Sequence, residues 1–423
     1  MQFSNAVTRF SLGDVPVIGN TVTGAIVGLT EDGIKLCDAL GSGCCGADAV
    51  SVEQTMLLEY LVRNGFVVDE GKESSAETAS RLETAYLHVT NRCNMACKGC
   101  YSYTNNRNDS IDPTYDELAH SLRVLAKIGI SQLVVSGGEP FLRDDLPALV
   151  AYANDVGIQS VNVLTNGTLC APSALELLSD CVDVISVLFN NTGDWVRSPF
   201  GNDCRVNQIK QAVKRIAEAG IRPHILFTLH AENIGDVPEM LEFGKQSGAT
   251  VGFSLLSGKR EMLGELFPTD DQLRLLARVM HEVGEWEEIS TISPDISEWS
   301  LRACKQCGAG ITTLSISAEG NVYPCHMLHY PEYCCGNAFL DSAKDIQSAL
   351  SKMLLPTVDE LDDCNTCSDR YICGGGCRAR MFLNEGFAEG KDPYCAYYSQ
   401  RIDFKITEFL SSVLGEQNNA IRD

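Results

Sequence analysis

From Tyr86 onward, short apolar runs of strand length alternate with helical patterns. The strand-like runs are YLHVT, QLVVS, SVNVL, DVISVLF, HILFTL and VGFSLL, and helical patterns such as YDELAHSLRVLAKIG and VNQIKQAVKRIAEAG lie between them. Strands rich in Val, Leu and Ile that alternate with amphipathic helices indicate a parallel sheet covered by helices. Six such repeats predict an α/β fold with a partial (β/α)6 TIM-like barrel. Its functional residues are expected at the carboxyl ends of the strands.

The rest of the chain predicts further parts around this barrel. Residues 1–70 read as strands, two helices and a closing strand, which is a small winged-helix pattern. Thr30 is the expected cap of the first helix, and Met56, Leu57, Tyr60 and Leu61 are expected on one face of the second. The predicted boundaries are a module over 1–70, a linker over 71–85, the barrel over 86–285, a bridging region over 286–303, a cysteine-rich domain over 304–399 and a C-terminal helix over 400–423.

Composition excludes several classes of protein. The 423 residues are 44% hydrophobic and 21% charged, as in an ordinary globular chain, and no run of apolar residues is long enough for a transmembrane helix. The N-terminus has no secretory signal pattern, so we expect a cytoplasmic protein without a membrane partner. Lys and Arg number 33 against 56 Asp and Glu, a net charge of −23 that argues against nucleic-acid binding.

Nineteen cysteines are the chemical anomaly of the sequence. In a reducing compartment, clustered thiols bind metal or do chemistry more often than they form disulfides. Cys93, Cys97 and Cys100 follow the first strand in CxxxCxxC spacing, and three thiolates on one loop can hold three corners of an iron–sulfur cube. Zinc prefers four ligands and fits this loop less well. The scattered Cys37, Cys170, Cys181 and Cys204 are most simply small buried apolar residues.

A second motif, Ser-Gly-Gly-Glu-Pro at 136–140, follows the next strand. Adjacent glycines let a backbone approach a ligand closely, and Glu139 could accept hydrogen bonds from an ammonium group, although the motif taken alone favours a strand-ending turn. The two motifs together resemble the radical S-adenosylmethionine (radical SAM) enzymes over about residues 86–260. The resemblance implies that Cys93, Cys97 and Cys100 hold a 4Fe–4S cluster that binds SAM. It also implies that Gly137, Gly138 and Glu139 contact the methionine amino end of SAM.

Two further segments bear on this resemblance. Thr165-Asn166-Gly167, after the third strand, matches a TNGT run common in one subgroup and adds Thr165 and Asn166 to the implied SAM contacts. The fourth strand departs from the family pattern, because Ser186-Val187-Leu188-Phe189 stands where relatives often read Ser-Leu-Asp-Gly. A ribose contact for Ser186 is the corresponding expectation.

Ten more cysteines crowd between residues 304 and 395. Their spacing permits a pair of zinc ribbons, but it also resembles the SPASM extension of radical SAM enzymes that mostly modify peptides and proteins. That resemblance implies two auxiliary 4Fe–4S clusters, three clusters in all. The first auxiliary set is Cys364, Cys367, Cys373 and Cys395, and the second is Cys307, Cys325 and Cys377 with Cys304. Cys334 and Cys335 fall outside the pattern.

Residues 1–70 resemble the peptide-binding element of ribosomal-peptide maturases, through GAIVGLTEDGIKLCDAL and LLEYLVRNGFV. In that family a leader peptide adds a strand to the exposed edge of the module. The resemblances together imply a maturase that forms a 5′-deoxyadenosyl radical and installs a thioether or carbon–carbon cross-link in a precursor peptide. Its electron would come from a reductant such as flavodoxin or ferredoxin.

Three other functions stay open at this point. They are modification of a sulfatase-type protein, modification of a tetrapyrrole or other cofactor, and a zinc scaffold that binds peptides. No catalytic base is identified, and His88, His224, His230 and Tyr101 are candidates only.

Overall fold

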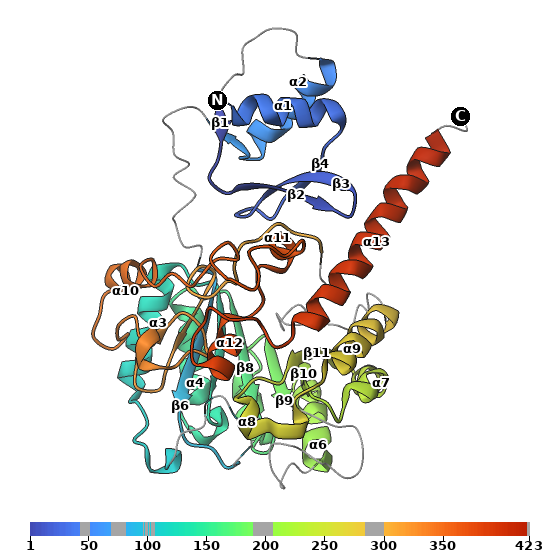
Figure 1. The fold of residues 1–423 in the computed structure, drawn as a ribbon. Coiled ribbons are helices and arrows are strands. Elements are labelled where there is room, and N and C mark those ends of the chain that lie inside the picture. The colour runs from blue at the N-terminus through green and yellow to red at the C-terminus, as the bar shows by residue number, and fades with distance from the viewer. Residues whose placement is uncertain are drawn as a thin grey trace.

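The computed structural model describes residues 1–42, 51–68, 82–95, 97, 100, 102, 106–188, 206–283 and 300–420. Its centre is an eight-stranded sheet in the order β11-β10-β9-β8-β7-β6-β12-β13, in which β6 to β11 are all parallel (Figure 1). These six strands are β6 (Thr84–Thr90), β7 (Gln132–Gly137), β8 (Ser160–Thr165), β9 (Val184–Leu188), β10 (Arg222–Leu229) and β11 (Thr250–Leu255). The predicted partial (β/α)6 barrel is confirmed.

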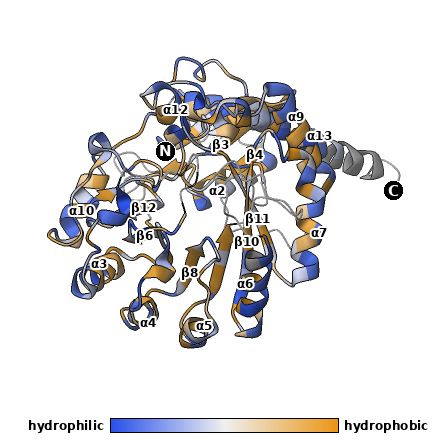
Figure 2. Ribbon diagram, turned by 90° about the horizontal axis from the view of Figure 1, so that it is seen from below, coloured by the Kyte–Doolittle hydropathy of each residue, from blue (hydrophilic) through white to orange (hydrophobic). Residues whose placement is uncertain are grey.

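One helix follows each strand and covers the outer face of the curved sheet (Figure 2). These helices are α3 (Tyr115–Ile128), α4 (Leu146–Asp155), α5 (Pro172–Leu178), α6 (Val206–Glu218), α7 (Val237–Ser247) and α9 (Asp270–Val283). Ala85, Leu87 and Val89 of β6 belong to the buried core shared with the helices, so the alternate residues Tyr86 and His88 face the inside of the barrel. The alternation of strand and helix therefore decides which side chains line the barrel.

Short helices complete this part of the chain. They are α8 (Arg260–Leu263) and the 3-10 helices η1 (Arg107–Asp109), η2 (Pro140–Leu142), η3 (Ile234–Asp236) and η4 (Gly264–Leu266). No helix in the described ranges is both long enough and apolar enough to cross a bilayer.

The cysteine-rich region continues the barrel sheet. β12 (Thr313–Ile316) pairs in parallel with β6, and β13 (Val322–Tyr323) pairs antiparallel with β12. The other elements are η5 (Pro331–Tyr333), α10 (Ala343–Leu350), α11 (Arg370–Cys373), α12 (Arg378–Glu385) and α13 (Cys395–Ala420). The predicted C-terminal helix is present as α13, which begins at a cysteine and packs against α9 (Figure 1).

The N-terminal module has a three-stranded antiparallel sheet in the order β2-β3-β4 and a separate β1-β5 pair. Its elements are β1 (Gln2–Phe3), β2 (Val7–Leu12), β3 (Val15–Asn20), β4 (Ile26–Gly28), α1 (Glu31–Gly41), α2 (Val52–Arg63) and β5 (Val67–Val68). Thr30 caps α1 as predicted, because its side chain accepts a hydrogen bond from Gly33 N. The winged-helix classification of this module stays a prediction.

One prediction about α2 is wrong. Leu57, Leu58 and Leu61 pack into the core of the module, whereas Met56 and Tyr60 are 67% and 46% exposed. The side of the helix that faces the core is therefore formed by Leu57, Leu58 and Leu61. Met56 and Tyr60, which belong to the predicted face, lie outside it.

Candidate functional site

The three cysteines of the first motif lie on one loop at the carboxyl end of β6. The Cys93 amide donates to Asn108 Oδ1 at 2.9 Å, and the Met95 amide donates to the Cys93 sulfur at 3.4 Å. The Cys100 amide donates to Cys97 O at 3.4 Å. These local hydrogen bonds hold the backbone of the loop that carries the three thiols.

A buried arginine lies against this loop. Arg107 is 4% exposed, and its guanidinium donates to Cys100 Sγ at 3.7 Å and to Met95 O. Burial raises the pKa of the Cys93 thiol, while the Met95 amide and the positive charge of Arg107 oppose that rise. Arg107 therefore favours the thiolate form, which is the form that binds metal. The sequence analysis missed this residue, whose only signal was its place just after the cysteines.

Gly137 and Gly138 allow the segment after β7 to pack against the backbone at the start of the cysteine loop. A Cβ on Gly137 would lie 2.3 Å from Thr90 O, and one on Gly138 would lie 2.0 Å from Arg92 O. The Gly138 amide donates to Thr90 O, and the Glu139 amide donates to Arg92 O, both at 2.8 Å. Both glycines therefore allow a close approach to the backbone of the cysteine loop, and their contact with SAM stays a prediction.

Glu139 is fully buried and joins the ends of β7 and β8. Its carboxylate accepts from Thr165 Oγ1 at 2.7 Å, from the Asn166 amide at 2.8 Å and from the Phe141 amide at 3.1 Å. Burial raises the pKa of Glu139, and these three hydrogen bonds counteract part of the rise. The sequence did not reveal that the chain itself supplies so many donors to this carboxylate.

Asn166 connects the third strand to the cysteine loop. Its side-chain amide donates to Asn94 Oδ1 at 2.9 Å and to the Cys93 sulfur at 3.9 Å. The structure thereby brings together the cysteine loop, residues 137–139 and residues 165–166. Ser186 lies apart from these contacts on β9, where its buried hydroxyl donates to Asn162 Oδ1 at 2.9 Å.

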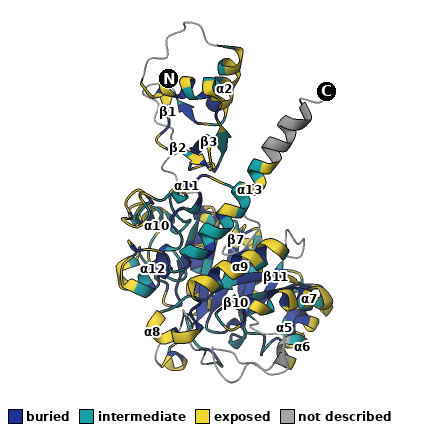
Figure 3. Ribbon diagram, turned by 45° about the vertical axis from the view of Figure 1, so that its right-hand side comes forward, coloured by how far each residue is buried: buried dark blue, intermediate teal, exposed yellow. Residues whose placement is uncertain are grey.

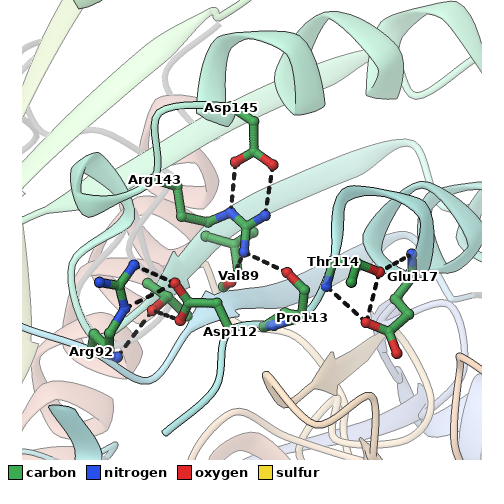
Figure 4. Close-up of polar contacts among 9 residues, drawn as sticks. Val89, Arg92, Asp112, Pro113, Thr114, Glu117, Arg143 and Asp145 are labelled. Atoms are coloured by element: carbon green, nitrogen blue, oxygen red, sulfur yellow. Dashed lines mark hydrogen bonds and ion pairs between the residues drawn. The ribbon is translucent and has the colours of Figure 1, made fainter. Parts of the chain in front are cut away.

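Two salt bridges hold the segments around the cysteine loop (Figure 4). Arg92 and Thr90 both donate to Asp112, and Arg143 makes a two-pronged contact with Asp145 at 2.7 and 2.8 Å. Arg143 also donates to Val89 O and Pro113 O. Burial alone would raise the pKa of Asp112, but the hydrogen bonds from Arg92 and Thr90 bring it below the ordinary value. The loop therefore starts from a fixed backbone.

The later cysteines fall into neighbouring groups. Burial raises the pKa of Cys395, and the nearby Cys364 and Cys367 thiols raise it further. Burial also raises the pKa of Cys373, as do the nearby Asp392, Cys395 and Cys304. These interactions indicate that Cys395 lies near Cys364, Cys367 and Cys373, the other members of one predicted set.

The other predicted set is divided. Cys307, Cys325 and Cys377 surround one apolar cluster with Leu328, Leu355 and Ala379 at its centre. Cys304 lies next to the 372–374 segment instead, with its thiol donating to Ile372 O at 3.2 Å. Burial raises the pKa of Cys304 to about 11, and the Cys307 thiol adds to the rise. Cys304 is therefore close to both groups.

A buried ion pair links the chain around two of these thiols. Asp392 and Arg380 are 3% and 1% exposed, and Arg380 Nη2 donates to Asp392 Oδ2 at 2.9 Å. The same carboxylate accepts from the Cys377 amide at 2.6 Å, and Asp392 O accepts from the Cys395 amide at 2.9 Å. One acidic residue thus fixes the backbone of a cysteine from each predicted set.

These arrangements fit the iron–sulfur chemistry expected of them. The donors are sulfur atoms, grouped on partly buried backbone, as such clusters require. Across the described ranges no three His, Cys, Asp or Glu side chains converge as the ligands of one ion. Cys334 is exposed and Cys335 buried, and Cys37 and Cys170 are buried as predicted. Cys204 lies outside the described residues.

The candidate bases are mostly buried. His88 is tilted against His329 with ring centroids 4.6 Å apart, and His224 Nδ1 lies 2.9 Å from Thr250 Oγ1. Burial lowers the pKa of His224 and of His230 to about 4. Both are therefore neutral at pH 7. Tyr101 lies outside the described residues.

Comparisons with known proteins agree with this geometry. Residues 87–244 match the radical SAM superfamily, and residues 304–368 match SPASM, an iron–sulfur cluster-binding domain. A PqqA peptide cyclase of Granulibacter bethesdensis is 26% identical over 73% of this chain and 85% of its own length. An AdoMet-dependent heme synthase of Methanosarcina barkeri is also 26% identical, over 73% of this chain and 95% of its own.

Solved structures share the fold. Native anSMEcpe with bound AdoMet has a TM-score of 0.62 at 16% identity and covers 79% of this chain and 99% of that one. Streptococcus suis SuiB bound to precursor peptide SuiA has a TM-score of 0.59 at 16% identity and covers 92% of this chain and 98% of that one. The radical SAM and SPASM domains make S-adenosylmethionine and iron–sulfur clusters the cofactors. The chain is a radical SAM enzyme with a SPASM domain.

Proposed function

We propose that this enzyme modifies a ribosomally made precursor peptide and installs a thioether or carbon–carbon cross-link in it. The observation that carries the proposal is that one chain contains all three of the following features. A cysteine loop tied to two neighbouring strand ends is followed by a second group of thiols, and among the described residues no further strand pairs with the edges of the N-terminal sheet. Relatives that act on peptides, such as the PqqA peptide cyclase, support this choice.

Cys93, Cys97 and Cys100 would hold the first 4Fe–4S cluster, and Gly137, Gly138, Glu139, Thr165, Asn166 and Ser186 would line the SAM site. When bound, the cluster and SAM together supply a carbon radical that removes a hydrogen atom from the peptide. The positive charge of Arg107 opposes the rise that burial causes in the pKa of the Cys93 thiol. Since Glu139 is already bonded to three donors of its own chain, its contribution is to fix the strand ends around the SAM amino group.

The later thiols would hold two auxiliary clusters. Cys364, Cys367, Cys373 and Cys395 form one ligand set, and Cys307, Cys325 and Cys377 with Cys304 form the other. The grouping of the thiols around Cys395 and around Leu328 supports this division for the other seven cysteines, whereas Cys304 lies near both groups. A flavodoxin or ferredoxin of the cytoplasm would supply the electron.

The N-terminal module would bind the leader of the peptide. Among the described residues no strand pairs with the outer side of β4, so a leader could add a strand there. Along α2, Val52, Met56 and Tyr60 are 79%, 67% and 46% exposed, at a spacing of four residues on one face. The Thr30 hydroxyl donates to Glu53 at 2.7 Å, which places the start of α2 beside the end of β4. A strand of leader along β4 could therefore bury apolar side chains on α2.

The first test is a count of iron, sulfide and zinc per chain after anaerobic reconstitution. About twelve irons with matching sulfide are expected for three clusters. About four irons with two zincs would leave the radical SAM site and refute the auxiliary clusters. Replacement of Cys93, Cys97 and Cys100 by alanine should remove about four irons and abolish SAM cleavage.

The second test concerns the peptide. With reductant and SAM, the enzyme should change the mass of a precursor peptide encoded beside its gene. Met56→Asp should weaken binding of the leader at least tenfold without loss of iron, because it adds a charge to the apolar stripe. Leu177→Asp is the matched control, since Leu177 is equally exposed at 67% but lies on α5 of the barrel. SAM cleavage that leaves every such peptide unchanged would contradict the proposal.

Modification of a tetrapyrrole is the second candidate, because the heme synthase matches this chain at the same identity as the peptide cyclase. A titration with porphyrins, followed by absorption at visible wavelengths, distinguishes modification of a tetrapyrrole from modification of a peptide. Saturable porphyrin binding, together with no binding of any leader, would favour the tetrapyrrole.

A further inference from the structure

The N-terminal sheet has both of its faces covered. One face packs Ile18 and Leu29 against α1 and α2 in the core of the module. The other face packs Leu12 and Val17 against Ile372 of α11 and Ile402 of α13. Figure 3 shows this sheet seated next to α11 and the start of α13. The module is thus joined to the cysteine-rich region through a shared apolar core.

The closest contact involves Ala303, which is 1% exposed. Its amide donates to Gly24 O at 3.0 Å, and the neighbouring Arg302 donates to Thr23 O at 3.3 Å. A Cβ on Gly19 of β3 would lie only 2.6 Å from Ala303 Cβ. Gly19 is not at a positive φ, so what demands a glycine there is the approach of Ala303 together with the Phe10 ring at 2.9 Å.

Ala303 is directly followed by Cys304, whose surroundings the module also touches. The Cys304 amide donates to Tyr371 O at 2.7 Å, and its thiol donates to Ile372 O. Tyr371 lies against Phe10 of β2, with ring centroids 5.7 Å apart. The module therefore contacts both chain segments that meet at Cys304, one before the thiol and one that leads to Cys373.

We propose that the N-terminal sheet is a clamp that positions Cys304 and is needed for the auxiliary cluster of Cys304 to bind, in addition to its role toward the leader. Gly19, Gly24 and Phe10 are positioning residues in this clamp. The proposal rests on the proposed function, which assigns Cys304 to a cluster. One consequence is that deletion of the module removes metal as well as leader affinity, so point variants of the full chain are required to separate the two.

The test adds a methyl group at Gly19 of the contact with Ala303 and, in a second variant, also removes the methyl group of Ala303. Gly19→Ala inserts a Cβ that collides with Ala303 and with the Phe10 ring, and the double variant Gly19→Ala with Ala303→Gly relieves the collision with Ala303, so that only the ring must still shift. Gly41→Ala is the control, because a Cβ on this glycine of α1 meets no atom within 4 Å. Phe10→Leu is a second variant, which removes the ring contact with Tyr371 without adding volume.

Two readouts are taken on the full chain. The first is the rate at which iodoacetamide alkylates Cys304 in the reduced, metal-free protein, followed by mass spectrometry. The second is iron per chain after reconstitution. Gly19→Ala should speed alkylation at least fivefold and lower iron from about twelve to about eight, with leader affinity unchanged within twofold. Phe10→Leu should act in the same direction. The double variant should recover part of the change seen in Gly19→Ala, because the contact with the Phe10 ring remains, and Gly41→Ala should behave as the unaltered protein does.

Unchanged alkylation in Gly19→Ala and Phe10→Leu would overturn the clamp, and so would full iron content despite faster alkylation. A double variant that recovers none of the change seen in Gly19→Ala would also overturn it, because the effect would then not arise at Ala303. If the unaltered protein itself holds only about four irons, the auxiliary clusters of the proposed function are refuted. The alkylation rates still decide whether the module holds Cys304.

Discussion

The two cysteine regions of this enzyme are built in different ways. In the first, three thiols lie within residues 93–100, and their partners Arg107 and Asn108 follow shortly after in the chain. In the second, the thiols are spread from Cys304 to Cys395. Their backbone is held by Asp392 and, at Cys304, by a segment that contacts Gly24. A local loop needs few long-range contacts, whereas an assembled site depends on every element that brings its parts together.

The largest expected effect is at the assembled site. Asp392→Ala leaves Arg380 buried without its carboxylate and removes the acceptor of the Cys377 amide. We expect a loss of about 3–5 kcal/mol in the free energy of unfolding, since an unpaired buried charge is costly. Urea unfolding measures this loss, and iron analysis should show that the auxiliary clusters are lost first. Asp271→Asn is the control, because its ion pair with Arg274 is exposed.

The next prediction addresses the local loop. Arg107→Gln removes the positive charge beside Cys100 and weakens the hydrogen bond to Met95 O. A loss of about 1.5–3 kcal/mol is expected, because a hydrogen bond from a buried charged group is removed. Iron should fall by about four atoms per chain while the auxiliary set stays loaded. Loss of all iron together would show that the two regions are not independent.

A third prediction concerns pH. Burial raises the pKa of Glu139 in the folded protein, so the folded state binds more protons than the unfolded state above the ordinary carboxyl pKa. The stability due to this group therefore falls as pH rises from about 4.3 toward the raised value, by at most about 1.4 kcal/mol per pH unit. Glu139→Gln should flatten the stability curve in that window. An identical pH dependence in the variant would show that Glu139 ionises normally.

The smallest effect is expected just outside the local loop. Thr114 caps α3 and forms a reciprocal pair with Glu117 (Figure 4). Thr114→Ala should lower stability by about 1 kcal/mol, the ordinary cost of a lost helix cap. Iron content should stay the same, because no hydrogen bond joins the cap to the described part of the cysteine loop. Loss of iron in this variant would show that even the cysteine loop depends on the stability of α3.

Much of the fold could be predicted because its signals are local. The apolar runs at β6 to β11 and the helices between them follow from periodicity, and the Thr30 cap follows from a single residue and its neighbours. The face of α2 was predicted wrongly, since Leu57, Leu58, Met56 and Tyr60 are all compatible with burial until a sheet is placed beside them. Pairing of β12 with β6 was not foreseen, because strand partners far apart in sequence leave no periodic signal.

The sequence by itself determined the residue types and spacings of the cofactor sites. Cys93, Cys97 and Cys100 lie close together for simple reasons of chain length, and any fold that exposes this loop keeps them so. Tertiary structure decided that Glu139 would be saturated by Thr165 and Asn166, and that Cys304 would lie between two groups of thiols. It also decided that the N-terminal sheet would pack against Ala303. Such contacts join residues from tens to hundreds of positions apart, and only the packing of whole elements brings them within bonding distance.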